Sequence, residues 1–266
     1  MPQWRYVSFL VLAFSLCYLF TCKPVEAKAS LFLTEDVLYL SSERRVVSVN
    51  VLNRGSRTGV FSVRWLDHTM LSNGHLKRLP TGEPEHSLVP FVRFSPRRMT
   101  LKPGQSQRIK IALKRSANAA PSKEYYSHLN VTTINDDLEA TLSQKAEISE
   151  TNGMHIKARM GISIPVIWRH NVEPAQVSLT VISNTSPDPE VVIEKRGEAS
   201  LRAYLHVFNQ RNDDLTPHPV IMYPNITSRS IPLKIEEMGE GPLRVVLSES
   251  PHRNRALTSP LIDIEL

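Results

Sequence analysis

Side chains capable of acid–base, nucleophilic or metal chemistry are scattered along this chain of 266 residues. The sequence contains no H-E-x-x-H metal motif, no G-x-S-x-G turn and no glycine-rich phosphate loop. No pattern pairs two carboxylates for acid–base catalysis. We therefore expect a protein without catalysis, metal or cofactor. Its histidines are expected to lie apart on the surface, at positions 68, 75, 86, 128, 155, 170, 206, 218 and 252.

The pattern that could bind a partner is an alternation of apolar residues from 154 to 168. A period of two places successive side chains on opposite faces of a β-strand. The odd positions include the basic residues Lys157 and Arg159, so the expected strand has one apolar face and one basic face. The apolar face comprises Met154, Ile156, Ala158, Met160, Ile162, Ile164, Val166 and Trp168.

This expected strand is too long for one small sandwich to pair and bury. Strands usually run about five or six residues, whereas this one would span about 50 Å at roughly 3.3 Å per residue. We therefore expect part of the strand to overhang and to offer its apolar row to another molecule. The alternative is that the whole row belongs to an ordinary core.

Residues 1–29 have the pattern of a signal peptide that is removed on export. Arg5 gives a positive start, residues 7–20 are apolar but short for a membrane span, and small residues near Ala27 suit cleavage. A retained N-terminal anchor is the alternative. Both cysteines, Cys17 and Cys22, lie in this segment, so the exported chain would depend on burial rather than on disulfides.

The rest of the chain reads as short strands separated by turns, which predicts an all-β protein. Residues 30–170 are expected to form a first domain. Residues 171–174 look like a hinge. About seven strand patterns then follow in residues 171–266, and this number indicates a second β-sandwich domain.

Within the first domain, residues 31–40 are expected to form one strand and the polar residues 67–86 a loop. Residues 135–153 are polar and acidic, and they suit a long mobile loop and a short surface helix equally well. The formal charge of the full chain is +6, but no dense run of Lys and Arg with interleaved aromatic residues is present. Nucleic-acid binding is therefore not expected, and the mild basicity favours acidic protein partners.

Three stretches resemble the periplasmic pilus chaperones of the PapD type. Residues 94–109, F-S-P-R-R-M-T-L-K-P-G-Q-S-Q-R-I, are similar to the family's P-x-x-x-x-L-x-P-G-x-x-Q-x-x-R-[IV] pattern. Residues 123–130, K-E-Y-Y-S-H-L-N, are similar to its R-E-S-x-F-x-x-N motif. The long strand ends in I-W-R, where the family has an aromatic residue and an arginine before the hinge. The resemblance spans roughly residues 30–171, and the second half matches only in size and strand content.

The resemblance implies two immunoglobulin-like β-sandwich domains in a boomerang arrangement. It also implies donor-strand complementation, in which an edge strand of the chaperone fills the groove of a subunit whose own sandwich lacks a strand. By position, the donor residues would be Met154, Ile156, Ala158 and Met160. The residues that would pack inside the protein itself are Ile162, Ile164 and Val166.

The resemblance extends to contacts at the junction of the domains. Glu124 and Arg169 match a family pair that braces the two domains, although they could also be unrelated surface charges. The family holds the subunit's C-terminal carboxylate with an Arg on the first strand and a Lys on the long strand. Here Asp36 falls near the first position and Pro165 at the second, so how this chain would hold that carboxylate is left open. The S-I-P-V sequence at 163–166 resembles the divergent, archaic-type branch.

We therefore predict a non-enzymatic periplasmic chaperone that captures pilus or surface-fibre subunits and delivers them to an outer-membrane usher. The expected partners are pilin-like subunits and the usher, with self-association through the donor edge when free, and no small-molecule substrate. The runner-up is an exported structural or adhesive component of a surface fibre. A third hypothesis, a periplasmic carbohydrate-active enzyme, lacks any constellation of carboxylates.

Overall fold

A computed structural model describes residues 29–134, 160–182, 190–209, 218–233, 244–249 and 262–265. The first part of this chain contains two short 3-10 helices and ten strands. They are β1 (Leu31–Leu33), β2 (Leu38–Leu40), β3 (Val46–Asn53), β4 (Gly59–Met70), β5 (Leu76–Leu79), η1 (Val89–Phe91), β6 (Val92–Ser95), β7 (Arg98–Leu101), β8 (Ser106–Leu113), η2 (Arg115–Ala119), β9 (Lys123–Ile134) and β10 (Gly161–His170).

These strands form a sandwich of two sheets, with strand orders β1-β3-β8-β6 and β2-β10-β9-β4-β5, and β7 also pairs with β4. Alternate side chains of facing strands fill the space between the sheets. Val49 on β3 lies opposite Ile109 on β8, and both are buried. Phe61 on β4 and Val131 on β9 close the same core from the other sheet.

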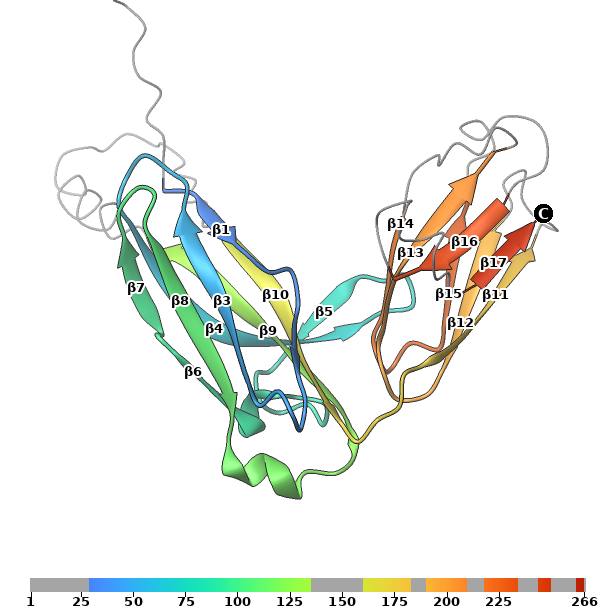
Figure 1. Cartoon of the computed structure of the whole chain (residues 1–266), viewed down its shortest axis with the longest axis horizontal. Helices are drawn as coiled ribbons and strands as arrows, with labels where there is room; N and C mark the ends of the chain where they lie inside the picture. The colour runs from blue at the N-terminus through green and yellow to red at the C-terminus, as the bar shows by residue number, and fades with distance from the viewer. Residues whose placement is uncertain are drawn as a thin grey trace, which may run out of the picture.

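The second sandwich follows after residue 170. It contains β11 (Gln176–Ile182), β12 (Glu190–Arg196), β13 (Leu201–Phe208), β14 (His218–Met222), β15 (Ser228–Pro232), β16 (Arg244–Ser248) and β17 (Ile262–Glu265). Its sheets have the orders β11-β12-β15 and β14-β13-β16-β17. Figure 1 shows the two sandwiches as the arms of a V that meet where β10 leads into β11. The predicted fold class, two β-sandwiches in a boomerang arrangement, is confirmed.

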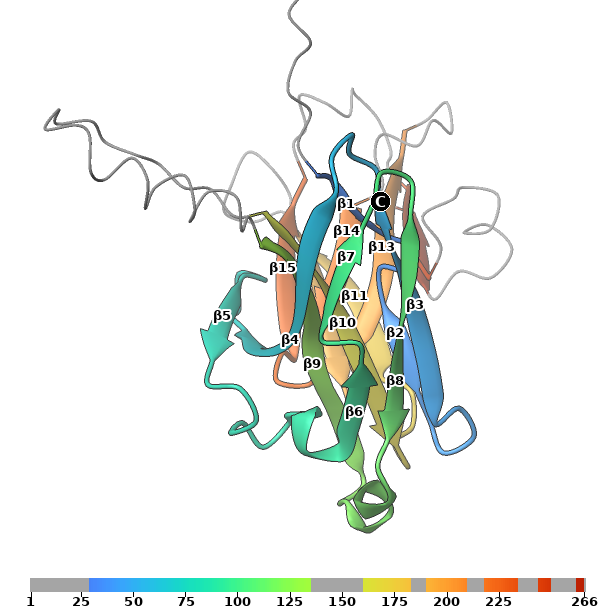
Figure 2. The same cartoon turned by 90° about the vertical axis from the view of Figure 1, so that its left-hand side faces the viewer.

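Two local expectations are wrong. Residues 31–40 are not one strand, because β1 pairs antiparallel with β3 in one sheet and β2 pairs parallel with β10 in the other. Residues 67–86 are not all loop, because β4 continues to Met70 and folds back into β5 as a hairpin. The hairpin shows no regular apolar alternation, because it leaves the sandwich and only Met70 of residues 67–79 enters a buried apolar cluster. Figure 2 shows β5 projecting sideways from the first sandwich.

The tip of this β4–β5 hairpin contacts the second sandwich. The side-chain amide of Asn225 donates a hydrogen bond of 2.8 Å to the carbonyl oxygen of Met70. Gly74, at the tip, has a φ of 82° and lies against Arg229, whose guanidinium would be 2.8 Å from an added Cβ. Any side chain at residue 74 would therefore be strained by this backbone conformation and would displace the Arg229 guanidinium.

The junction between the sandwiches is apolar as well. Met70, Tyr126 and Ile167 of the first sandwich belong to the same buried cluster as Tyr223 and Ile226 of the second. Ile167 therefore breaks the expectation of a polar odd face on the long strand. The reason is that the second sandwich covers that face near the hinge.

Candidate functional site

One edge of β10 is open over half of its length. All ten residues of β10 pair with β9 on one side. On the other side β2 pairs only with residues 166–168. Among the described residues, no strand pairs with that side of residues 161–165. Pro165 lies in this stretch, and a residue without an N–H group suits an unpaired edge better than a strand paired on both sides.

The apolar row of β10 runs from the core into solvent. Trp168, Val166 and Ile164 are buried in the first sandwich. Ile162 is partly buried against the same core. Met160, one residue before the strand begins, is 79% exposed. The expectation that residues 162, 164 and 166 pack inside the protein is thus confirmed.

The remaining donor residues cannot be placed in the same way. Met154, Ile156 and Ala158 lie outside the described residues, and so do most of the segments expected as a signal peptide and as a long loop. The backbone carbonyl of Met160 accepts a hydrogen bond of 3.1 Å from the N–H of Thr133, next to the end of β9. The assignment of the donor residues stays a prediction, and Met160 is the one of them that lies within the described residues.

Glu124 and Arg169 are brought together at the junction of the sandwiches. They lie opposite each other on β9 and β10, and Arg169 Nε is 3.0 Å from Glu124 Oε2. The same Glu124 oxygen accepts a hydrogen bond of 3.0 Å from the backbone N–H of Ser200. Arg169 donates in turn to the Ser200 carbonyl oxygen at 2.9 Å. The pair therefore grips the backbone just before β13, and Ser200 is a partner that no side-chain pattern in the sequence could reveal.

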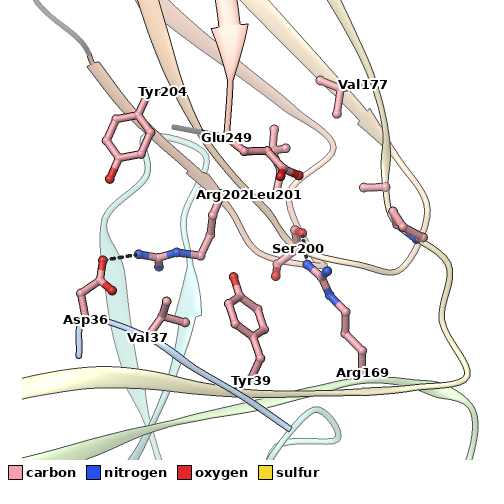
Figure 3. A pocket seen from close by; sticks show the side chains of 12 residues that line it. Asp36, Val37, Tyr39, Arg169, Val177, Ser200, Leu201, Arg202, Tyr204 and Glu249 are labelled. Carbon is pink, nitrogen blue, oxygen red and sulfur yellow. Dashed lines mark hydrogen bonds and ion pairs between the residues drawn. The ribbon is translucent and has the colours of Figure 1, made fainter. Parts of the chain in front are cut away.

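A cleft of about 580 Å³ opens beside this contact, between β2 of the first sandwich and β13 of the second. Figure 3 shows Arg169 and Arg202 pointing into it. Tyr39 lies between the two arginines in the same view. The centre of its ring is 5.4 Å from the guanidinium carbon of Arg169. The other lining residues are Asp36, Val37, Pro174, Ala175, Val177, Ser200, Leu201, Tyr204 and Glu249.

The cleft contains two arginines and two carboxylates, those of Asp36 and Glu249, and its polar groups are incompletely satisfied. Arg202 Nη2 lies 3.7 Å from the carboxylate of Asp36, whose side chain is 80% exposed. Because this ion pair is long and exposed to solvent, it is weak. The hydroxyl of Ser200 is buried and makes no hydrogen bond within the described structure. Burial raises the pKa of Tyr39, although Arg202 and Arg169 oppose that shift. A carboxylate is the kind of group that such a cleft can hold.

Sequence reasoning missed Arg202 because a basic residue that alternates with core residues along a strand usually marks a solvated face. Its neighbours Leu201 and Ala203 are buried in the second sandwich, while Arg202 faces the cleft. Pro165 and Asp36 leave no basic side chain at the two positions that the resemblance indicates. Arg202 and Arg169 place positive charge in the cleft from other elements.

The histidines also depart from expectation. His128 and His206 are buried rather than on the surface. His68 and His128 do not lie apart, because their Nδ1 atoms are 3.2 Å from each other. In the described parts of the chain, no three His, Cys, Asp or Glu side chains are grouped as metal ligands. None of the described helices has the length and apolarity needed to cross a membrane.

Comparison with known proteins reveals the fold. No protein-family model and no curated protein sequence matches the chain. The chain is similar to the solved structure of the CsuC-CsuE chaperone-tip adhesion subunit pre-assembly complex from archaic chaperone-usher Csu pili of Acinetobacter baumannii. The TM-score is 0.52 with 12% identity, over 89% of this chain and 98% of the other. The E. coli chaperone DraB matches with a TM-score of 0.50 and 12% identity, over 90% and 98% of the two chains. The chain therefore has the fold of the PapD-like chaperones of chaperone–usher pathways.

Proposed function

We propose that the protein is a non-enzymatic periplasmic chaperone that captures incomplete pilus or surface-fibre subunits by donor-strand complementation and delivers them to an outer-membrane usher. The observation that carries the proposal is the open edge of β10 at residues 161–165, with the exposed Met160 just before it. An open strand edge offers unpaired N–H and C=O groups to an added strand. The apolar side chains at alternate positions before and along β10 would fill the groove of the subunit whose sandwich lacks a strand.

The energies suit reversible capture. Burial of a large apolar side chain contributes roughly 1.5–3 kcal/mol. Met154, Ile156, Ala158 and Met160 together would contribute on the order of 5–9 kcal/mol before the cost of ordering the segment. This is enough to hold an aggregation-prone subunit and small enough for another donor strand to replace the chaperone. Lys157 and Arg159 would lie on the opposite face, where charge disfavours edge-to-edge pairing of two chaperones.

The alternative role as a fibre component gains no support from the first strands. A fibre subunit should carry a donor segment directly after its leader. Here β1 pairs with β3, and β2 pairs with β10, so residues 31–33 and 38–40 already complete the protein's own sheets.

The cleft would hold the C-terminal carboxylate of the captured subunit. Arg202 is the proposed ligand, supported by its position in the cleft and by its long contact with Asp36. Asp36 would occupy the place of the client carboxylate in the free protein.

The donor proposal is tested by the double variant Ile156→Asp and Met160→Asp. We expect it to fold normally but to lose co-purification with co-expressed subunits encoded near its gene, because charged side chains cannot enter an apolar groove. The matched control is Gln107→Asp with Thr180→Asp, two exposed positions on β8 and β11, which should retain capture. Undiminished capture by the folded donor variant would rule out the donor-strand mechanism.

A further inference from the structure

The junction of the sandwiches contains a buried chain of hydrogen bonds that the proposed function does not use. Tyr223, in the turn after β14, places its hydroxyl 2.7 Å from Nε2 of His128 on β9. The Nδ1 atom of His128 lies 3.2 Å from Nδ1 of His68 on β4. His128 is only 3% exposed. A single chain of polar contacts therefore runs from the second sandwich into the first.

The hydrogen bonds among Tyr223, His128 and His68 are compatible with only a limited number of protons on the two imidazole rings. A neutral imidazole carries one N–H donor and one lone pair. With both rings neutral, Tyr223 can donate to His128, and His128 can donate through Nδ1 to His68; the reverse direction is equally complete. With both rings protonated, two N–H groups face each other across 3.2 Å, and the contact between the rings becomes repulsive. One added proton keeps the hydrogen bonds, but on the buried His128 it places a charge in an apolar junction, whereas His68 is only partly buried.

The surroundings favour the neutral form. Burial lowers the pKa of His128 to about 4, with a further lowering from His68 and Arg202, while Asp67 acts in the opposite direction. Burial also lowers the pKa of His68, as does Arg78 on β5. Positive charges thus approach the pair from β5 and from β13, and one carboxylate, Asp67 on β4, opposes them.

Asp67 is already engaged by other donors. One of its oxygens accepts hydrogen bonds from the Ser87 hydroxyl at 2.8 Å and the Gly82 N–H at 2.7 Å. The other oxygen accepts from the Ser127 hydroxyl at 2.5 Å. Its carboxylate is therefore not positioned to form an ion pair with a protonated His128.

A third histidine and the tyrosines complete the surroundings. The Nε2 atom of His86 lies 3.1 Å from the backbone oxygen of His68. Its ring stacks on Tyr126 with a centroid distance of 4.3 Å. Burial lowers the pKa of His86, and the hydrogen bond to the His68 backbone and the charge of Asp67 oppose this shift; Lys123 lowers the pKa slightly and Glu85 raises it slightly.

The tyrosine rings join the chain to the apolar junction. Tyr126 lies on the same strand as His128, and its ring centre is 4.4 Å from that of Tyr223. Burial raises the pKa of Tyr223, with Arg202, Glu124 and Tyr39 as its charged or titratable neighbours. Tyr223 is therefore a neutral partner at acid pH, and the histidines are the titrating groups there.

We propose that the chain His68–His128–Tyr223 is an acid-sensitive latch: protonation of the histidines breaks it and loosens the contact between the two sandwiches. A charged imidazole can be hydrated only if water enters between β9 and the turn after β14, which is where the sandwiches touch. The proposal goes beyond the proposed function, because it concerns the free protein and requires no client.

The test measures the distance between the sandwiches as a function of pH. Spin labels are attached to cysteines at Lys110→Cys on β8 and Thr180→Cys on β11, both exposed positions. Cys17 and Cys22, the chain's two cysteines, are replaced by serine. We expect a narrow distance distribution at about pH 7 that broadens reversibly as the pH falls to about 4. His128→Gln should remove this transition, and His218→Gln, an exposed histidine on β14, should keep it.

A distribution that stays unchanged down to about pH 4, or a transition of full size in His128→Gln, would overturn the latch. A second measurement does not depend on the folding of a variant. NMR of the unmodified protein should show the His128 ring titrating far below the ordinary histidine range, with the Tyr223 ring resonances shifting at the same midpoint. Tyr223 resonances that do not respond when His128 titrates would equally reject the proposal.

Discussion

At the residue scale, our proposal for Arg202 is that its guanidinium exchanges Asp36 for the carboxylate of a captured subunit. Its guanidinium meets an exposed carboxylate at 3.7 Å in the free protein, a geometry that contributes little to stability. Removal of Arg202 should therefore leave folding nearly intact. A charge-assisted hydrogen bond to a client carboxylate, by contrast, contributes about 1.5–3 kcal/mol.

Arg202→Gln is therefore expected to weaken capture of a subunit with a free C-terminus by about ten- to a hundredfold. Calorimetric titration with a purified subunit, or with a peptide of its last residues, measures this loss. A subunit whose terminus is amidated should bind the unmodified protein and Arg202→Gln with equal affinity. If the variant weakens both forms of the subunit alike, Arg202 does not recognise the carboxylate.

At the scale of elements, β9, β10 and the backbone before β13 meet at one buried carboxylate. The Glu124 side chain is fully buried, and its Oε2 atom serves both Arg169 and the Ser200 N–H. A buried carboxylate that loses its cation is costly, because its desolvation is no longer offset. We infer that this contact acts as the brace between the sandwiches, together with the apolar cluster around Ile167.

Arg169→Gln should accordingly lower the free energy of unfolding by about 3 kcal/mol, measured by urea denaturation. The control is Lys123→Gln, which breaks a neighbouring ion pair of the same 3.0 Å length whose partner, Glu85, is 94% exposed. That control should cost less than about 1 kcal/mol. Equal losses in the two variants would show that the Glu124 contact adds nothing beyond an ordinary surface pair.

At the scale of the whole molecule, the buried junction makes stability depend on pH. The ordinary pKa of histidine is 6.5, and the folded protein lowers the pKa of His128 to about 4. The unfolded chain therefore binds more protons than the folded one between these two values. The contribution of neutral His128 to the free energy of unfolding is fully present above about pH 6.5 and is lost as the pH falls towards 4.

The expected loss from His128 is about 3 kcal/mol over this range, since each pKa unit corresponds to about 1.4 kcal/mol. Urea denaturation at a series of pH values measures it. The His128→Gln variant should show a flatter profile, and His218→Gln should follow the unmodified protein. An unchanged slope in His128→Gln would mean that other groups cause the acid sensitivity.

The hairpin β4–β5 shows where local patterns lose their information. Its strands leave the sandwich, so the apolar residues between 67 and 79 follow no core period, and the many polar residues around them resemble a loop. The neighbours that hold it, Asn225 and Arg229, lie some 150 residues away along the chain. A single sequence contains no signal for such a pairing.

The amino-acid sequence by itself determined most of the strands, the two sandwiches and the apolar row that ends at Trp168, because burial on one face of a strand imposes a period of two that can be read directly. Only the tertiary structure decided which edge of β10 stays open, which arginines face the cleft and that His68 meets His128. These features depend on backbone groups and on side chains brought together from distant strands. Contacts between residues far apart in the sequence leave no periodic pattern in it, so they can be identified only once the three-dimensional fold is known.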